Sequence, residues 1–180
     1  MSQLGRFITF EGSEGVGKTT QIKNLARWFE ERGREVVLTR EPGGTELAER
    51  VRELVLDKSL PAMASDTELL LIYAARAEHV ARVIKPALAA GKVVISDRFA
   101  DASLAYQGYG RGIALERLQV LHHWVLQGFS PDLTLLLDMP VGEGMARARA
   151  RSELDRFEQE HLDFFEKVRE GYLSIAQAEP

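Results

Sequence analysis

Residues 8–20 read ITFEGSEGVGKTT, an apolar run that ends at a stretch in which three of six residues are glycine. The stretch from Gly12 to Thr19 fits the pattern G-x-x-x-x-G-K-[S/T] in full, between residues 6–10, which read as a buried strand, and residues 18–32, which read as a helix. In this setting the glycines let backbone N–H groups surround the phosphates of a nucleotide, and the helix N-terminus adds positive potential. Lys18 would reach the outer phosphates and Thr19 would bind magnesium. The stretch therefore predicts a phosphate-binding loop, with a glycine-rich turn that fits by chance as the alternative.

Four short apolar runs read as strands, and segments with helical periodicity separate them. The predicted strands are residues 6–10, 35–39, 92–96 and 133–137. The predicted helices include residues 18–32, 66–90 and 155–178, and residues 42–45 read as a turn that caps a further helix. Apolar strands without alternation, separated by helices, are typical of a parallel sheet covered on both faces. We therefore predict a three-layer α/β fold of the P-loop NTPase type, in one domain over residues 1–180, with a mobile lid.

The composition limits the classes of function. The chain has 180 residues, of which 45% are hydrophobic and 28% charged, so it can bury a core of ordinary size. It has no cysteine, which excludes disulfides and thiolate metal sites, and its four histidines show no metal-ligand spacing. A net charge of -4 argues against a large nucleic-acid surface. Because no apolar run is long enough for a membrane span or a signal peptide, we expect a cytoplasmic protein without a membrane partner.

Charged residues follow three of the predicted strands. Asp97 and Arg98 follow the third strand, at the edge where open α/β sheets bind ligands. Asp97 is suited to hold magnesium through its water shell and Arg98 to grip a phosphate with two parallel hydrogen bonds, with a strand-end salt bridge as the alternative. Glu41 follows the second strand and could join the same water shell, unless this segment is only a turn with solvated charges. Asp138 follows the fourth strand but has no cation beside it, so we rank it lower.

Neutral polar side chains recur at helical spacing just beyond Arg98. Ser103, Tyr106 and Gln107 can share one face and are suited to read a sugar or a base, although packing alone could account for Tyr106. Arg76 stands among alanines on the long predicted helix, where it could also extend to solvent. Several polar strand ends beside one phosphate loop indicate two anionic substrates that face each other. A second phosphorylated compound is thus the expected acceptor.

The phosphate loop by itself is shared by GTPases, ATPase motors and small-molecule kinases. A GTPase would read guanine with an Asn-Lys-x-Asp element, yet the only asparagine here is Asn24, inside the first predicted helix. A separate segment carries Arg147, Arg149 and Arg151, which alternate with alanine. An arginine delivered by a closing segment stabilises the charge of a phosphoryl group in transfer. The alternative for this segment is a solvated basic helix.

Taken together, the motifs FEGSEGVGKTT, LTREPGGT, YAAR, SDRF, AYQG, SPDLTLLLD and RARARSELDRFEQE make the chain resemble the bacterial thymidylate kinase family. The resemblance implies transfer of the γ-phosphoryl group of ATP to dTMP, giving dTDP and ADP for dTTP biosynthesis. It also implies Mg²⁺ as cofactor, a homodimer, and a lid at about residues 142–158. Two other readings stay open, namely a kinase for dUMP or UMP, and a nucleotide-binding switch without acceptor chemistry.

The resemblance also assigns roles to residues. Glu14 should meet the sugar 3'-hydroxyl of dTMP, Arg98 its phosphate and Arg76 its thymine, while Tyr106 should crowd a ribose 2'-hydroxyl. The expected catalytic residues are Lys18, Arg98, Arg149, Arg151 and Glu14. The expected ATP-binding residues are Gly12, Ser13, Glu14, Gly15, Val16, Gly17, Lys18, Thr19 and Thr20. The expected substrate-binding residues are Glu14, Glu41, Pro42, Tyr73, Arg76, Arg98, Ser103, Tyr106, Gln107 and Asp155. The expected metal-binding residues are Thr19, Asp97, Glu41 and Glu158.

Three features depart from the family's pattern. Gly15 follows Glu14 where some relatives have an arginine, so the cation should come from the lid, here residues 147–156. Ile72 stands where relatives have a phenylalanine that stacks on the base, so either Tyr73 stacks instead or the base rests on an aliphatic surface. The family's last strand and helix are expected to be absent from residues 1–180, which would weaken the adenine site.

Overall fold

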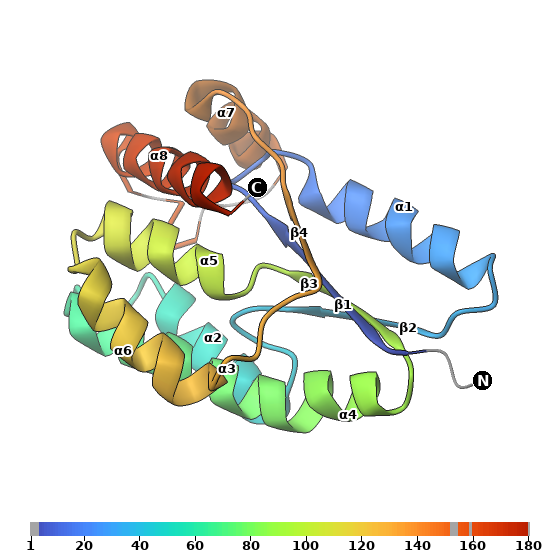
Figure 1. The fold of residues 1–180 in the computed structure, drawn as a ribbon. Helices are drawn as coiled ribbons and strands as arrows, with labels where there is room; N and C mark the ends of the chain where they lie inside the picture. Colours follow the sequence, from blue (N-terminus) through green and yellow to red (C-terminus); the bar gives the residue numbers. More distant parts are fainter. Residues whose placement is uncertain (1–3, 152–154, 159, 180) are drawn as a thin grey trace.

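The centre of the protein is a sheet of four parallel strands (Figure 1). The structure, a computed structural model, describes residues 4–151, 155–158 and 160–179. The strands are β1 (Arg6–Glu11), β2 (Val36–Arg40), β3 (Val93–Asp97) and β4 (Leu133–Leu136), in the order β2-β3-β1-β4. Each predicted strand is confirmed to within one residue at either end, and the parallel sheet is confirmed as well.

The register of the sheet places the carboxyl ends of β1, β2 and β3 side by side at one edge of the sheet. Asp97 on β3 pairs with Phe10 on β1 and with Arg40 on β2. The residues that follow these positions therefore leave the sheet along the same edge, as parallel pairing requires. This edge is where Glu11, Glu41 and Arg98 emerge.

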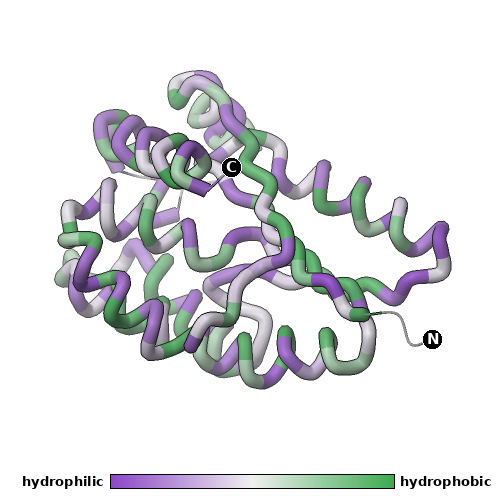
Figure 2. Tube along the Cα trace, in the orientation of Figure 1, coloured by the Kyte–Doolittle hydropathy of each residue, from purple (hydrophilic) through white to green (hydrophobic). Residues whose placement is uncertain are grey.

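Helices cover both faces of the sheet, as the sequence predicts (Figure 1). On one face α1 (Lys18–Glu30) packs Ile22 and Ala26 against Ile8 and Ile95 of the sheet. The opposite face packs against η1 (Val80–Ile84), α4 (Lys85–Ala89) and α6 (Leu115–Leu126). Apolar residues of the strands are buried between the two layers, and Figure 2 shows hydrophobic stretches along the strands.

The long helix predicted over residues 66–90 is confirmed as a helical path from Ser65 to Ala89. It consists of α3 (Ser65–His79), the π-helical η1, and α4. The buried residues of α3 lie on more than one face, as predicted, because α2 (Glu46–Leu56) and α6 pack on either side. The predicted cap of the helix that precedes it is also present, since the N–H of Ala48 donates to the Thr45 hydroxyl at 3.1 Å.

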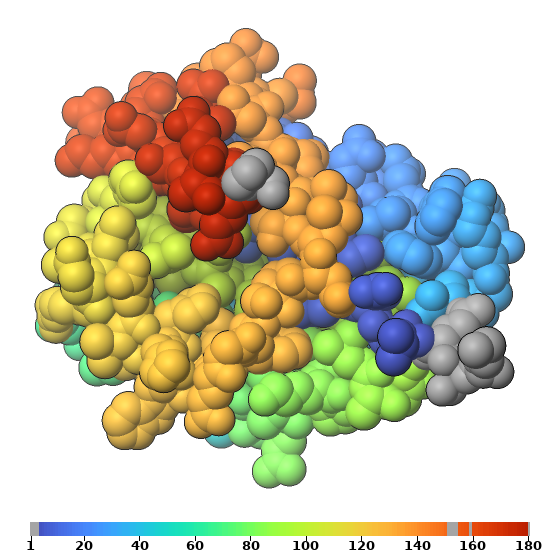
Figure 3. Space-filling view, in the orientation of Figure 1, coloured from blue at the N-terminus to red at the C-terminus, as the bar shows by residue number. Residues whose placement is uncertain are grey.

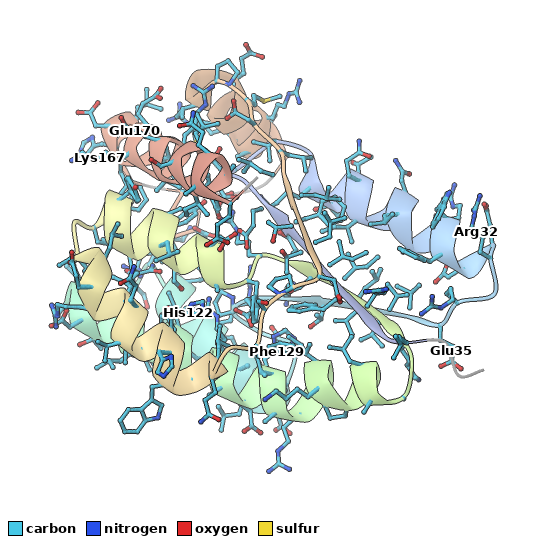
Figure 4. All side chains as sticks on the ribbon, viewed as in Figure 1. Arg32, Glu35, His122, Phe129, Lys167 and Glu170 are labelled. Atoms are coloured by element: carbon cyan, nitrogen blue, oxygen red, sulfur yellow. The ribbon has the colours of Figure 1, made fainter. Side chains whose placement is uncertain are left out.

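The remaining helices are α5 (Ala100–Ser103), η2 (Leu104–Gly110), α7 (Val141–Arg151) and α8 (Leu162–Ala178). Helix α8 lies directly against η2, and Figure 3 shows the two in contact at the surface. Phe165 and Val168 of α8 are buried, whereas Lys167 and Glu170 point away from the protein (Figure 4). Among the described residues, none of the helices combines the length and the apolar character that a membrane span needs.

The prediction that a helix begins at residue 155 is wrong. Residues 155–158 form a turn, in which the N–H of Glu158 donates to Asp155 Oδ1 at 2.9 Å and the N–H of Asp155 donates to Glu158 Oε2 at 3.0 Å. This reciprocal pair satisfies backbone donors locally, in the manner of a capping box, and so competes with helical pairing. The helix itself begins at Leu162.

Candidate active site

One cavity of about 550 Å³ opens at the carboxyl edge of the sheet. The phosphate loop forms one end, and α3, α5 and η2 form the other. Most of the predicted site residues line it, namely Glu14, Gly15, Val16, Gly17, Lys18, Thr19, Thr20, Glu41, Pro42, Arg76, Asp97, Arg98, Ser103, Tyr106, Gln107, Asp155 and Glu158. The two predicted groups, for ATP and for an acceptor, therefore meet in one cavity.

The phosphate loop has the backbone that its glycines predict. Gly15 and Gly17 have φ of 72° and 96°, in the left-handed region that favours glycine. The ammonium group of Lys18 donates to the carbonyls of Gly12 and Ser13, at 2.8 and 2.9 Å. Burial, and then the nearby Arg98, lower the pKa of Lys18 to about 8. The loop thus has a positive electrostatic potential, and a bound polyanion would stabilise the charged form of Lys18.

Arg98 is held in a strained backbone conformation at the end of β3. Its φ of 72° is rare for a residue with a side chain, and it is fixed because Arg98 N–H donates to the Phe10 carbonyl at 2.9 Å and Ser96 Oγ donates to the Arg98 carbonyl at 2.7 Å. The side chain is thereby turned into the cavity, where its guanidinium lies 4.8 Å from the centroid of the Tyr106 ring. Burial lowers the pKa of Arg98, but the charge of Glu14 leads the groups that raise it well above its ordinary value.

Glu14 joins the phosphate loop to Arg98. Its Oε1 accepts a hydrogen bond from Arg98 Nη2 at 2.5 Å and another from the Tyr106 hydroxyl at 3.0 Å. The three side chains come from the loop, the end of β3 and η2, and all three line the cavity. The salt bridge of Arg98 therefore runs to Glu14 of the phosphate loop and not to Asp97, the neighbour that the alternative reading would pair with it, and the bridge faces the cavity.

Arg76 does not extend to solvent, so that alternative is wrong. It is 1% exposed, with Nε donating to Glu41 Oε2 at 2.6 Å and Nη2 donating to the Phe99 carbonyl at 2.9 Å. Its Nη1 is buried without a partner among the residues that the structure describes. Glu41 also pairs through Oε1 with His79 Nδ1 at 2.9 Å. A free donor on a rigidly held guanidinium is suited to bind a ligand carbonyl.

The predicted magnesium ligands differ in whether their oxygen atoms already have hydrogen-bond partners. Asp97 Oδ1 is buried and has no hydrogen-bond partner within the described part of the chain, and Thr19 lines the same cavity. Both carboxylate oxygens of Glu41, in contrast, are already paired with Arg76 and His79. In the described segments no group of three or more acidic, histidine or cysteine side chains forms a preassembled metal site. Asp97 and Thr19 are thus the residues whose chemistry fits a cation that is bound mainly by phosphates and water.

Ile72 lines the cavity, whereas Tyr73 does not. The Tyr73 ring packs in the core with Leu69 and Leu118, and the Arg76 guanidinium lies 4.7 Å from its centroid. Of the two expected surfaces for a base, this arrangement favours the aliphatic one. Asp138 pairs with Arg169 at 2.7 Å away from the cavity, in agreement with its lower rank.

Two of the lid arginines lie outside the cavity in this structure. Arg147 and Arg149 of α7 are exposed and do not line it, and the side chain of Arg151 lies outside the described residues. The side chain of Arg156 is held by two hydrogen bonds. Its Nε donates to the Val55 carbonyl at 2.6 Å, and its Nη2 donates to Glu68 Oε2 at 2.5 Å. Asp155 and Glu158, which follow the lid helix, do reach the cavity.

Sequence reasoning missed Glu11, the last residue of β1. Its Oε1 accepts from the N–H of Phe99 at 2.7 Å, and its Oε2 from the hydroxyl of Tyr172 at 2.9 Å. Burial, and then the charge of Asp101, raise the pKa of Glu11 to about 8. The Tyr172 hydroxyl also accepts a long hydrogen bond from Arg98 Nη1 at 3.5 Å. The available signal was a carboxylate at the end of a largely apolar strand, a position where a buried acid needs a hydrogen-bond partner.

Comparisons with known proteins agree with this geometry. A family model described as thymidylate kinase matches residues 10–180. The chain is 60% identical over 176 residues to the thymidylate kinase of Pseudomonas putida strain GB-1, which covers 98% of this chain and 84% of that protein. It is 58% identical over the same shares to the thymidylate kinase of Ectopseudomonas mendocina strain ymp. The crystal structure of thymidylate kinase from Ehrlichia chaffeensis matches with a TM-score of 0.81 and 39% identity, over 98% of this chain and 89% of that chain.

Proposed function

The chain belongs to the thymidylate kinase family, and from that premise we propose that its cavity transfers the γ-phosphoryl group of ATP to the phosphate of dTMP, giving dTDP and ADP. The observation that carries this proposal is the single cavity that runs from the phosphate loop past Arg98 to Arg76. To bind a polyanion, one end of the cavity needs cations and backbone N–H donors. To recognise a base, the other end needs hydrogen-bonding groups in fixed orientations. The cavity supplies both on opposite sides of Arg98.

ATP would place its phosphates on residues 12–20, where the backbone N–H groups and Lys18 face them. The Lys18 ammonium already lies within the loop, and its third proton is available for an outer phosphate because two carbonyls accept from it. The phosphate of dTMP would bind the Arg98 guanidinium with two parallel hydrogen bonds. This placement sets the two phosphates end to end, as in-line transfer requires.

dTMP would lie between Arg98 and the α3–η2 end of the cavity. Arg76 Nη1 is the buried donor that suits the thymine carbonyl, and Ile72 provides the apolar surface on which the ring rests. Glu14 would accept from the sugar 3'-hydroxyl, and the Tyr106 ring would crowd a 2'-hydroxyl. These contacts favour a deoxynucleotide with a carbonyl group on the far side of its base.

The transfer would rest on positioning and on charge. Lys18 and Arg98 neutralise the transferring group from two sides, and we propose that residues 142–158 close as a lid that brings Arg149 and Arg151 to it. Thr19, and Asp97 through water, would hold Mg²⁺, which would supply positive charge against the donor phosphates. Glu41 would act mainly on Arg76, because both of its oxygens are paired.

We also propose that the enzyme is a cytoplasmic homodimer of single-domain subunits. Adjacent helices α2, α3 and α6 expose large apolar side chains, namely Leu47, Leu54, Leu70, Val120 and Trp124. A second copy packed on this face would remove them from water. Light scattering should then report the mass of two chains, and a Trp124→Lys variant should shift the population toward one.

The activity is tested by an acceptor panel with ATP and Mg²⁺, comprising dTMP, dUMP, dCMP and UMP. We expect the largest kcat/KM for dTMP, with dTDP and ADP as products. A larger kcat/KM for UMP would replace the assignment with that of a uridylate kinase. Tight ATP binding with no phosphorylation of any monophosphate would replace it with a nucleotide-binding switch.

A further inference from the structure

A buried carboxylate two turns before Arg76 has no role in the mechanism above. Glu68 is 0% exposed, and it shares one face of α3 with Ile72 and Arg76 because the three residues are spaced four apart. Four charged or polar donors converge on its two oxygens. They are Gln107 Nε2 at 2.9 Å, Arg111 Nε at 3.3 Å, Arg111 Nη2 at 3.2 Å and Arg156 Nη2 at 2.5 Å.

These contacts make Glu68 an acceptor at both oxygens. Two guanidinium groups, which can only donate, contact both oxygens of Glu68, and Arg111 is itself held by Glu160 through Nη1 at 2.5 Å. A carboxylate cannot donate, so the amide of Gln107 must turn its NH₂ group toward Glu68. The choice between the two amide orientations, which geometry alone leaves open, is thereby settled by the partner.

The amide oxygen of Gln107 consequently faces the other way. Gln107 is buried, lines the cavity, and receives no hydrogen bond at Oε1 from the described residues. Arg76 and Ser103 line the same end of the cavity, and neither Arg76 Nη1, a donor, nor Ser103 Oγ has a hydrogen-bond partner within the described part of the chain. A base that enters here therefore meets a fixed donor on Arg76 and a fixed acceptor on Gln107.

We propose that Glu68 is a positioning residue that fixes the amide of Gln107 with its oxygen toward the base and so selects pyrimidines that carry an N3–H beside a 4-carbonyl group. This inference rests on the proposed function. Thymine and uracil offer an N3 donor and an O4 acceptor, whereas cytosine offers an N3 acceptor and a 4-amino donor. Cytosine would thus face Gln107 and Arg76 with the wrong polarity at both positions, and a site with fixed polar groups rejects such a mismatch strongly.

The Glu68→Gln variant tests the proposal, because a glutamine at this position can donate to Gln107 Oε1 and let the amide turn around. We expect the ratio of kcat/KM for dTMP to that for dCMP to fall on the order of tenfold. The ratio should not invert, since Arg76 still opposes the 4-amino group. Glu160→Gln is the matched control, because it loosens Arg111 without touching Gln107, and it should keep the wild-type ratio. Glu68→Asp retains a carboxylate and should also keep the ratio, even where its turnover falls.

A Glu68→Gln enzyme with wild-type thermal unfolding and an unchanged ratio would overturn the proposal, as would an equal change in Glu160→Gln. Should Glu68→Gln fail to fold, Gln107→Leu and Glu68→Asp decide the matter. The proposal requires that Gln107→Leu lose the preference for dTMP over dCMP and that Glu68→Asp retain this preference. The opposite result in either variant overturns the proposal. Wild-type enzyme that phosphorylates no monophosphate would instead refute the proposed function, so the two failures are distinguishable.

Discussion

In the proposed mechanism, the arrangement of the two substrates depends on Arg98. Its positive φ and its two backbone hydrogen bonds aim the guanidinium into the middle of the cavity, between the phosphate loop and the base-reading end. Its pairing with Glu14 and Tyr106 keeps it there in the absence of a ligand. The motif predicted the position of Arg98 in the sequence, but the strained backbone that aims it could not be predicted, because nothing in the local sequence requires a left-handed arginine.

Replacing Arg98 by alanine should weaken dTMP binding while largely sparing ATP. Loss of a charge-assisted pair of hydrogen bonds costs about 1.5–3 kcal/mol, or roughly a 10- to 150-fold rise in the Kd for dTMP. Isothermal titration of each nucleotide separately provides the measurement, and Arg117→Ala, which removes an exposed arginine paired with Asp66, is the control. An Arg98→Ala protein with wild-type dTMP affinity would contradict the placement.

Lys18 makes ATP binding take up a proton near pH 8. Its pKa of about 8 in the free protein leaves about half of the ammonium groups deprotonated at that pH, and the arriving phosphates raise the pKa again. Calorimetry at pH 8 in two buffers of different ionisation enthalpy should show an uptake of roughly half a proton. A Lys18→Arg variant, which stays protonated, should show none. Equal uptake in both proteins would assign the proton to another group.

Glu11 should make stability fall as pH rises. Its pKa is raised from 4.5 to about 8, so between these values the native state binds more protons than the unfolded state, and the free energy of unfolding declines with increasing pH. Between pH 5.5 and 8.5, Glu11 should lower the free energy of unfolding of the wild-type protein by on the order of 3 kcal/mol. The Glu11→Gln variant cannot ionise at this position and should not show this decrease. Urea unfolding across this range measures the difference, with the exposed Glu35→Gln as control. Parallel pH profiles for wild type and Glu11→Gln would disprove it.

At the scale of elements, helix α7 is docked on the phosphate loop through glycine. Gly144 and Gly15 approach so closely that a Cβ atom on either residue would overlap the backbone of the other segment, Glu14 in one case and Gly144 in the other. This contact gives a physical reason why no arginine side chain follows Glu14 here. It also joins the first turns of α7 to the phosphate loop, where we propose that ATP binds.

Substituting Gly144 by alanine should therefore displace α7 from the loop. We expect kcat/KM for ATP to fall about tenfold, an estimate based on the sensitivity of catalysis to displacements of about 1 Å. Gly142→Ala provides the matched control on the same helix, because a Cβ there meets nothing within 4 Å. It should stabilise the protein by about 0.5–1 kcal/mol through helix propensity and leave kinetics unchanged. Identical kinetics for the two variants would show that the contact has no bearing on function.

The lid arginines should act in turnover and not in ground-state binding. Arg149 is exposed, so its contribution depends on a closing movement of the lid, and the same expectation applies to Arg151. Arg149→Ala and Arg151→Ala should lower the single-turnover rate about tenfold or more, with smaller effects on the Kd for ATP or dTMP. Arg27→Ala on the exposed face of α1 is the control. Wild-type single-turnover rates in both lid variants would exclude these residues from catalysis.

On the scale of the whole molecule, the sequence predicted the sheet and most of the cavity because both follow from short-range patterns. Apolar strand runs fixed β1 to β4, and parallel pairing placed Asp97 level with Arg40 and Phe10. The prediction failed at the turn of residues 155–158, where a local pair of Asp155 and Glu158 competes with a helix. It also failed where distant segments meet, because the buried partners of Glu11 and Glu68 come from segments far away in sequence. Such pairings depend on the assembled tertiary structure, which no local window contains.

The central claim is that two phosphorylated substrates bind end to end in this cavity, and it is tested most directly by a crystal structure with dTMP and a non-hydrolysable ATP analogue. The account predicts that the dTMP phosphate binds the Arg98 guanidinium, with the base between Ile72 and Arg76 and the analogue's phosphates on residues 12–20. A dTMP molecule bound elsewhere, with Arg98 still paired to Glu14 and not to the dTMP phosphate, would contradict it.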